Sequence, residues 1–216
     1  MVLHYLYIGS LFLSALLSFV YRKNLKSRLL ILFVPFLFLL FVQELSLFFY
    51  VRKWPLASTG IVYNFYNPAS ALFFSILYYR IPLNAPLRKL IIWLASVYLT
   101  IVVLTFTFIQ PITIYNSYLA LAAGVVITCC GIFFLFNYFN IDNRTQEKHW
   151  LPVIWVTIGI VAFYPVVNIS FAFYKQLLAY RADIFGVKLY KVIPQLMSIF
   201  MYGCFSYAFY LCKKKN

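Results

Sequence analysis

The sequence predicts an all-α fold, a polytopic membrane bundle of seven transmembrane helices that forms one domain over residues 1–216. Hydrophobic residues make up 65% of the chain and charged residues 10%, whereas about 25% of residues are charged in soluble domains. The hydrophobic residues form blocks of about 20, which is long enough to cross ~30 Å of hydrocarbon as helices. These blocks are apolar on every side, whereas barrel strands alternate polar and apolar residues. A soluble domain and an outer-membrane barrel are therefore excluded.

Charged residues and prolines separate seven apolar blocks along the chain. The expected helices are residues 2–20, 29–50, 59–79, 89–109, 117–138, 150–173 and 190–211. The first block has no positive charge before it and basic residues after it, which is the reverse of a cleaved signal peptide. We therefore expect a retained first helix. The connections between blocks are short and leave no room for a domain outside the membrane.

Basic residues predict the orientation of the bundle, because short cytoplasmic loops accumulate Lys and Arg. With the N-terminus outside, the cytoplasmic segments contain Arg22, Lys23, Lys26, Arg28, Arg80, Arg88, Lys89, Arg144, Lys148, Lys213, Lys214 and Lys215. The outer segments contain Arg52, Lys53, Lys175, Arg181, Lys188 and Lys191. This imbalance predicts an N-out, C-in protein of the cell inner membrane. Its basic inner face is expected to contact anionic lipid headgroups.

The net charge of +14 is explained by this topology, so nucleic acid is not expected as a partner. No metal or other cofactor is expected either. The four cysteines lie in or at the ends of apolar blocks, without a histidine at ligand spacing: Cys129, Cys130, Cys204 and Cys212. The common catalytic and nucleotide-binding motifs are absent from the sequence, and no catalytic residue is predicted.

Glu44 is the one acidic residue inside an expected helix. An intramembrane carboxylate costs about 2.5 to 3.5 kcal/mol on insertion scales, so it indicates a functional site. The residues three and four positions away on the same helix have no side chain that can hydrogen-bond to it: Leu40, Phe41, Leu47 and Phe48. The partner of Glu44 is therefore expected on another helix.

Helix geometry places Glu44 in a layer of polar residues near the outer side, ~9 Å below the outer end of its helix. At ~1.5 Å per residue, Asn64, Asn168 and Gln195 lie ~8 Å deep and Asn67 ~12 Å deep, with His4 at the outer tip. Two prolines of this layer, Pro68 and Pro165, each free a backbone carbonyl inside the membrane. On the last helix, a polar stripe continues inward through Gln195, Ser198, Tyr202 and Ser206.

Two interpretations of this layer remain open. In the first, the layer is a hydrated or ligand-binding pocket that opens outward and is lined by His4, Glu44, Asn64, Asn67, Asn168 and Gln195. In the second, it is a buried polar clamp in which a protonated Glu44 hydrogen-bonds Asn64 or Asn67 and fixes helix packing.

Small residues repeat along one face of the fifth expected helix, at Ala120, Gly124, Thr128 and Gly131. Small side chains allow helix backbones to approach closely within a membrane. This face is expected to be a close helix contact, with an oligomer seam as the alternative.

Two short stretches carry a family resemblance: Tyr21-Arg22-Lys23-Asn24 after the first helix and Tyr63-Asn64-Phe65 at the start of the third. With these stretches, the chain resembles small seven-helix membrane proteins of uncharacterised function in Bacteroidota. The resemblance implies a seven-helix bundle and no particular activity.

Three classes of function are consistent with these observations. The first is a bundle that binds, senses or transports a small solute or proton through the outward pocket around Glu44. The second is an accessory or effector protein, in signalling or antiviral defence, that acts through a protein partner or as a homo-oligomer. The third is an intramembrane lipid enzyme, which a single carboxylate with His4 at the rim supports least.

Overall fold

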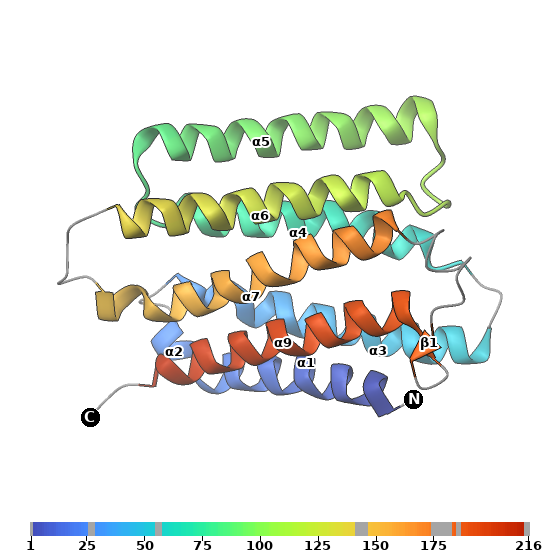
Figure 1. The fold of residues 1–216 in the computed structure, drawn as a ribbon, viewed down its shortest axis with the longest axis horizontal. Coiled ribbons are helices and arrows are strands. Elements are labelled where there is room, and N and C mark those ends of the chain that lie inside the picture. The colour runs from blue at the N-terminus through green and yellow to red at the C-terminus, as the bar shows by residue number, and fades with distance from the viewer. Residues whose placement is uncertain are drawn as a thin grey trace. The chain divides into compact units, whose positions relative to one another are not determined.

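The computed structural model describes residues 2–25, 29–54, 58–140, 147–173, 183–184 and 187–213. These residues are almost entirely helical, and one short antiparallel hairpin pairs Asp183 with Lys188 (Figure 1). The elements are α1 (Val2–Val20), α2 (Arg22–Leu25), η2 (Leu30–Leu32), α3 (Phe33–Lys53), α4 (Gly60–Arg80), α5 (Ala85–Leu104), η3 (Thr105–Ile109), α6 (Ser117–Phe139), α7 (Glu147–Ala172), β1 (Asp183–Ile184), β2 (Val187–Lys188) and α9 (Leu189–Leu211).

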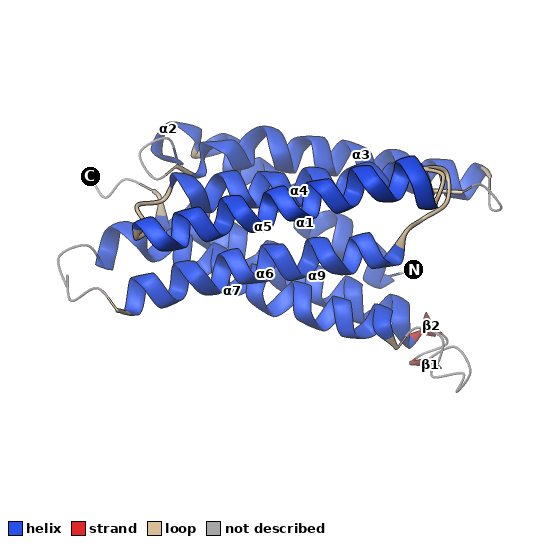
Figure 2. Cartoon of the chain, turned by 90° about the horizontal axis from the view of Figure 1, so that it is seen from above, coloured by secondary structure: helices blue, strands red, loops and turns tan. Residues whose placement is uncertain are grey.

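Each of the seven apolar blocks forms a long helix, with ends within a few residues of those expected. Two features at helix ends differ from a plain α-helix. The second block begins with the 3-10 turn η2, and the fourth ends in the π-helical turn η3, where Gln110 N donates to Thr105 O at 2.9 Å. The sequence analysis did not predict α2 or the β1–β2 hairpin, because segments this short have no periodicity to read. Figure 2 shows how little of the described chain is strand.

Six helices in the described part of the chain are long and apolar enough to cross a membrane, as expected for a multi-pass membrane protein. These six segments are Val2–Val20, Leu30–Lys53, Ala85–Ile109, Ser117–Phe139, Trp150–Ala172 and Leu189–Leu211. Helix α4 has 21 residues, so its length is sufficient, but its hydropathy is lower. Polar residues such as Asn64, Asn67, Ser70 and Ser75 account for this lower hydropathy.

The chain divides into two compact units, which are described separately. Unit 1 comprises residues 1–45 and 142–216, and its last helix, α9, packs against both α1 and α7. The ring of Phe33 on α3 lies 5.2 Å from that of Phe205 and 5.7 Å from that of Phe209 on α9. Helices α7 and α9 approach closely at Gly159, where a Cβ would lie 3.0 Å from Cys204 Cβ.

Unit 2 comprises residues 46–141, and in it α4 packs against α5 and α6. The contact between α4 and α6 includes Ser75 Oγ and Cys130 Sγ, 3.9 Å apart, and the rings of Tyr78 and Phe134, 5.9 Å apart. Because these pairs advance together along both chains, α4 and α6 run parallel. On α5, Tyr98 donates its hydroxyl hydrogen to the carbonyl of Leu119 at 3.3 Å.

Candidate functional site

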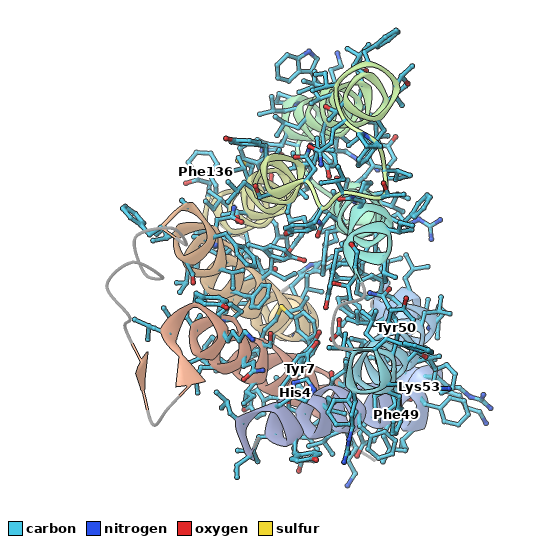
Figure 3. All side chains as sticks on the ribbon, turned by 90° about the vertical axis from the view of Figure 1, so that its right-hand side faces the viewer. His4, Tyr7, Phe49, Tyr50, Lys53 and Phe136 are labelled. Carbon is cyan, nitrogen blue, oxygen red and sulfur yellow. The ribbon has the colours of Figure 1, made fainter. Side chains whose placement is uncertain are left out.

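His4 and Gln195 form a polar contact between the N-terminal ends of α1 and α9. Gln195 Nε2 lies 3.3 Å from His4 Nδ1, and both residues are half-buried. The ring of Tyr7, one turn further along α1, lies 5.8 Å from the His4 ring and 6.2 Å from the ring of Tyr202 (Figure 3). Since residue numbers rise together in these contacts, α1 and α9 run parallel.

The contacts of unit 1 place Glu44 and Asn168 near the level of this pair. Helix α3 runs opposite to α9 (Figure 1). Counting along both helices from the contact of Phe33 with Phe205 and Phe209 places Glu44 opposite residues 194–198. Helix α7 also runs opposite to α9, and the rings of Trp155 and Tyr207 lie 4.8 Å apart. Counting back along α9 from Tyr207 places Asn168 opposite Gln195. Four helices of unit 1 thus contribute polar residues to one level.

Glu44 lies slightly deeper than His4 along the axis of α1. The rings of Phe12 and Phe41 lie 5.2 Å apart, and counting from that contact places Glu44 opposite Gly9. Five residues of helix separate Gly9 from His4, which corresponds to ~7.5 Å. Both Glu44 and Asn168 are half-buried.

Asn64 is the centre of a separate polar cluster in unit 2. Its Nδ2 donates to the carbonyls of Ile112 and Ile114 at 2.8 and 2.7 Å, and its Oδ1 accepts from Asn116 N at 3.0 Å. The residue is 3% exposed. Both amide hydrogens of Asn64 are therefore used to hold the segment that connects η3 to α6.

Other residues complete this cluster around the connecting segment. Asn116 accepts from Leu119 N at 3.0 Å, as an N-cap of α6, and donates to Gln110 Oε1 at 3.1 Å. Gln110 Nε2 donates to Ile114 O at 2.9 Å. Gly60 is required for the close approach of the segment, because a Cβ there would lie 2.7 Å from Tyr115 N. We call Asn64, Asn67, Gln110, Tyr115 and Asn116 the Asn64 cluster.

Asn67 belongs to the same cluster through its side-chain hydrogen bond with Tyr115. Burial raises the pKa of Tyr115, and the hydrogen bond from Asn67 offsets part of that increase. The ring of Tyr63 lies 6.3 Å from that of Tyr115. Tyr115 is thus held as a neutral phenol against α4.

The six residues of the predicted outer layer are therefore divided between the two units. Unit 1 brings His4 into contact with Gln195 and places Glu44 and Asn168 near their level. Asn64 and Asn67 bind the η3–α6 segment of unit 2, and a pocket shared by all six residues stays a prediction. The sequence analysis missed Gln110 and Asn116. Asn116 was detectable, because an Asn directly before a long apolar run is a typical N-cap.

The predicted packing face of α6 is largely inside unit 2. Gly124 and Gly131 are buried, Ala120 and Thr128 are half-buried, and Thr128 Oγ1 donates back to Gly124 O at 2.7 Å. The close helix contact at Gly159 on α7 was not predicted. Its signal in the sequence is a lone glycine in an otherwise large-residue block.

The cysteines are free thiols: Cys130, Cys204 and Cys212 are buried, and Cys129 is half-buried. The residues that the structure describes contain no group of three or more His, Cys, Asp or Glu side chains that could hold a metal ion. Several of the basic residues used to predict the orientation lie outside the described residues: Lys26, Arg28, Arg144, Lys175, Arg181, Lys214 and Lys215.

Comparison with known proteins gave no match to a protein-family model, a curated protein or a solved structure.

Proposed function

We propose that this protein is a multi-pass protein of the cell inner membrane that binds and transports a proton or small solute through an outward-facing polar site around Glu44. The observation that carries the proposal is that Glu44, His4, Asn168 and Gln195, on four helices of unit 1, lie within ~7.5 Å of one another in depth. Polar and ionisable residues inside a membrane are costly, and their convergence at one depth is typical of substrate and ion sites. A titratable carboxylate and an imidazole can both exchange protons.

The proposal includes α4 as a seventh transmembrane helix. Its 21 residues correspond to ~31 Å, about the thickness of the hydrocarbon core. Its polar side chains are directed to protein partners, since Asn64 binds the η3–α6 segment and Ser75 contacts Cys130. A helix shielded from lipid by α5 and α6 can carry such residues, so its low hydropathy is compatible with spanning.

The parallel course of α1 and α9 supports the same count. Two spanning helices that run in the same direction, and are the first and last of a bundle, require an odd number of crossings. Six crossings would make them antiparallel. Seven crossings with the predicted excess of cytoplasmic basic residues give the N-out, C-in orientation.

The inner face of the proposed bundle contains exposed cations next to aromatic rings. The guanidinium of Arg22 lies 4.7 Å from the centre of the Phe19 ring, and that of Arg88 lies 4.9 Å from the Tyr79 ring. Such pairs keep a cation at the membrane surface while the stem and ring remain apolar. They fit the proposed contact with anionic headgroups.

Proton flux into liposomes tests the proposed function. The purified protein is reconstituted with a pH-sensitive dye inside the vesicles, and a potassium gradient with valinomycin imposes a membrane potential. Glu44→Gln keeps the shape of the side chain and its hydrogen-bonding capacity but cannot titrate. We expect wild-type protein to acidify the lumen and Glu44→Gln to reduce the rate at least tenfold with an unchanged melting temperature.

Glu44→Asp is the matched control, because it retains a carboxyl group and should recover part of the flux. Gln43→Asn, one residue away, should leave the flux near the wild-type rate. A fully active Glu44→Gln protein would contradict the titrating role of Glu44. Wild-type vesicles that acidify no faster than empty ones would contradict proton transport.

A further inference from the structure

Polar side chains continue inward from the His4–Gln195 contact along both α1 and α9. His4, Tyr7, Ser14 and Ser18 occupy one face of α1, and Gln195, Ser198, Tyr202 and Ser206 occupy one face of α9. Contacts of the His4 and Tyr7 side chains with Gln195 and Tyr202 show that these two faces meet. We call these eight residues the α1–α9 seam.

Two of the four serines in the α1–α9 seam are satisfied by their own helices. Ser18 Oγ donates to Ala15 O at 2.7 Å, and Ser198 Oγ donates to Pro194 O at 2.7 Å. Ser18 is fully buried and Ser198 is 8% exposed. Backbone bonds of this kind are the usual arrangement for a serine inside a helix.

The other two serines, Ser14 and Ser206, differ in this respect. The Oγ atoms of both are buried and have no hydrogen-bond partner among the described residues. Ser14 is 0% exposed. Buried polar atoms are almost always hydrogen-bonded in native proteins, so an orphan of this kind usually indicates an ordered water or ligand.

Ser14 and Ser206 lie at the same level and on the facing sides of their helices. The His4–Gln195 and Tyr7–Tyr202 contacts place Ser14 opposite residues 205–209 of α9. Ser206 is three turns from Gln195 and shares its face. Phe205 and Phe209 of α9 contact α3, and Cys204 approaches α7, so the side of α9 at Ser206 is the side next to α1.

We propose that α1 and α9 bind ordered water between Ser14 and Ser206. The chemistry of the site favours water, because both groups are neutral hydroxyls that donate and accept, and water does the same. Helix α1 contains no Lys, Arg, Asp or Glu in its sequence, so a bound metal cation would lack a compensating charge.

The water site continues the row of polar groups in unit 1 from the His4–Gln195 contact towards the middle of the proposed membrane span. Ser14 lies ten residues, or ~15 Å, inward from His4 along α1. Tyr7 and Tyr202 occupy the space between these levels. The functional part of this inference, a hydrogen-bonded route inward from the Glu44 level, rests on the proposed function. The water site itself does not.

A double-mutant cycle on thermal stability in detergent tests the water site. If one water links the two serines, Ser14→Ala and Ser206→Ala should each lower the melting temperature, and the double variant should fall by clearly less than the sum. Ser18→Ala and Ser198→Ala are matched controls, since each loses only a bond to its own helix. If Ser14→Ala and Ser206→Ala instead raise the melting temperature or leave it unchanged, the hydroxyls are dry and the proposal is wrong.

Radiolytic labelling of the wild-type protein gives a second readout, because bound water generates hydroxyl radicals next to buried side chains. Tyr202 in the α1–α9 seam is 3% exposed, and Tyr78 on α4 is 0% exposed and packs on Phe134. We expect several-fold more oxidation at Tyr202 than at Tyr78. Equal labelling of the two tyrosines would overturn the proposal. Neither readout depends on flux, so loss of the proposed function at Glu44→Gln and loss of the water site are distinguished.

Discussion

The Asn64 cluster of unit 2 and the α1–α9 seam of unit 1 both contain polar side chains, but these differ in how their hydrogen bonds are satisfied. In the Asn64 cluster, the Asn64 side chain donates two hydrogen bonds to backbone carbonyls and accepts one from a backbone N–H, all within residues 112–116. In the α1–α9 seam, Gln195 contacts His4 and Tyr202 contacts Tyr7. The hydroxyls of Ser14 and Ser206 have no hydrogen-bond partner among the described residues.

The difference in hydrogen bonding indicates two reasons why an apolar helix contains a polar residue. A side chain whose every donor and acceptor is occupied by backbone contributes to stability and has nothing left for a ligand. A side chain with unused hydrogen-bonding capacity costs stability, so it is retained only where water or a ligand completes it. On this basis, Asn64 is structural, whereas Ser14 and Ser206 retain hydrogen-bonding capacity for a water or ligand.

The largest effect is expected at Asn64. Asn64→Leu keeps the volume but removes three hydrogen bonds, and the carbonyl of Ile114 then retains only its bond from Gln110 Nε2. At about 1 kcal/mol per bond, the loss is about 3 kcal/mol, or roughly 6 to 12 °C in melting temperature for a chain of this size. Thermal unfolding in detergent, followed by tryptophan fluorescence, measures this loss.

Two further variants at the same place sharpen the result. Asn64→Asp keeps the acceptor for Asn116 N but turns both donors into acceptors that face carbonyls, so it should be as destabilising as Asn64→Leu. Phe65→Leu, at a neighbouring side chain that is 62% exposed, should be nearly silent. If Asn64→Leu has the melting temperature of the wild-type protein, the Asn64 cluster does not stabilise unit 2. The proposed difference between the Asn64 cluster and the α1–α9 seam would then be wrong.

The sequence predicted the helices well, because blocks of about 20 apolar residues can form little else in a membrane. Each of the seven apolar blocks forms a helix, and a regular helix fixes the spacing of its residues along its axis. The outer polar layer of six residues stays a prediction. Seven transmembrane helices were expected, and six helices in the described part of the chain are long and apolar enough to cross a membrane. Helix α4 has polar residues that bind protein groups, and a hydropathy average does not distinguish these from residues exposed to solvent.

The partners of the polar residues could not be predicted. The depth of a residue along a helix does not give the direction of its side chain, so the segment that Asn64 binds could not be predicted. Glu44 was considered as the partner of Asn64 instead. Residues 110–116 contain no periodic pattern, and their backbone carbonyls are present in any sequence. The water site could not be inferred either, because Ser14, Ser18, Ser198 and Ser206 are chemically identical and only the structure separates satisfied from unsatisfied hydroxyls.

A smaller effect is expected where α7 meets α9 beside the α1–α9 seam. Gly159→Leu would place a side chain where even a Cβ lies 3.0 Å from Cys204 Cβ and 3.2 Å from Met201 O. Overpacking of this kind costs about 1 to 3 kcal/mol, and we expect a loss of roughly 2 kcal/mol in thermal unfolding.

Gly203→Leu on α9 is the matched control, since nothing lies within 4 Å of a Cβ at that position. It should not lower the melting temperature, because leucine is a better helix former than glycine. Equal losses for the two variants would mean that the cost arises from glycine replacement in general. The contact between α7 and α9 would then not be as close as described.

The smallest effect is expected at the His4–Gln195 contact. The two nitrogens are 3.3 Å apart, and both residues are half-buried, so water can replace much of what a substitution removes. Gln195→Ala should cost about 1 kcal/mol or less, or roughly 2 to 4 °C. His4→Ala should cost a similar amount, and the double variant should lose less than the sum if the two side chains bond each other.

We expect the coupling energy between His4 and Gln195 to be well below the loss of unfolding free energy caused by Asn64→Leu. A coupling as large as that loss would make the His4–Gln195 contact a structural clamp of the same kind, and the functional reading of unit 1 would then rest on Glu44 and Asn168 alone.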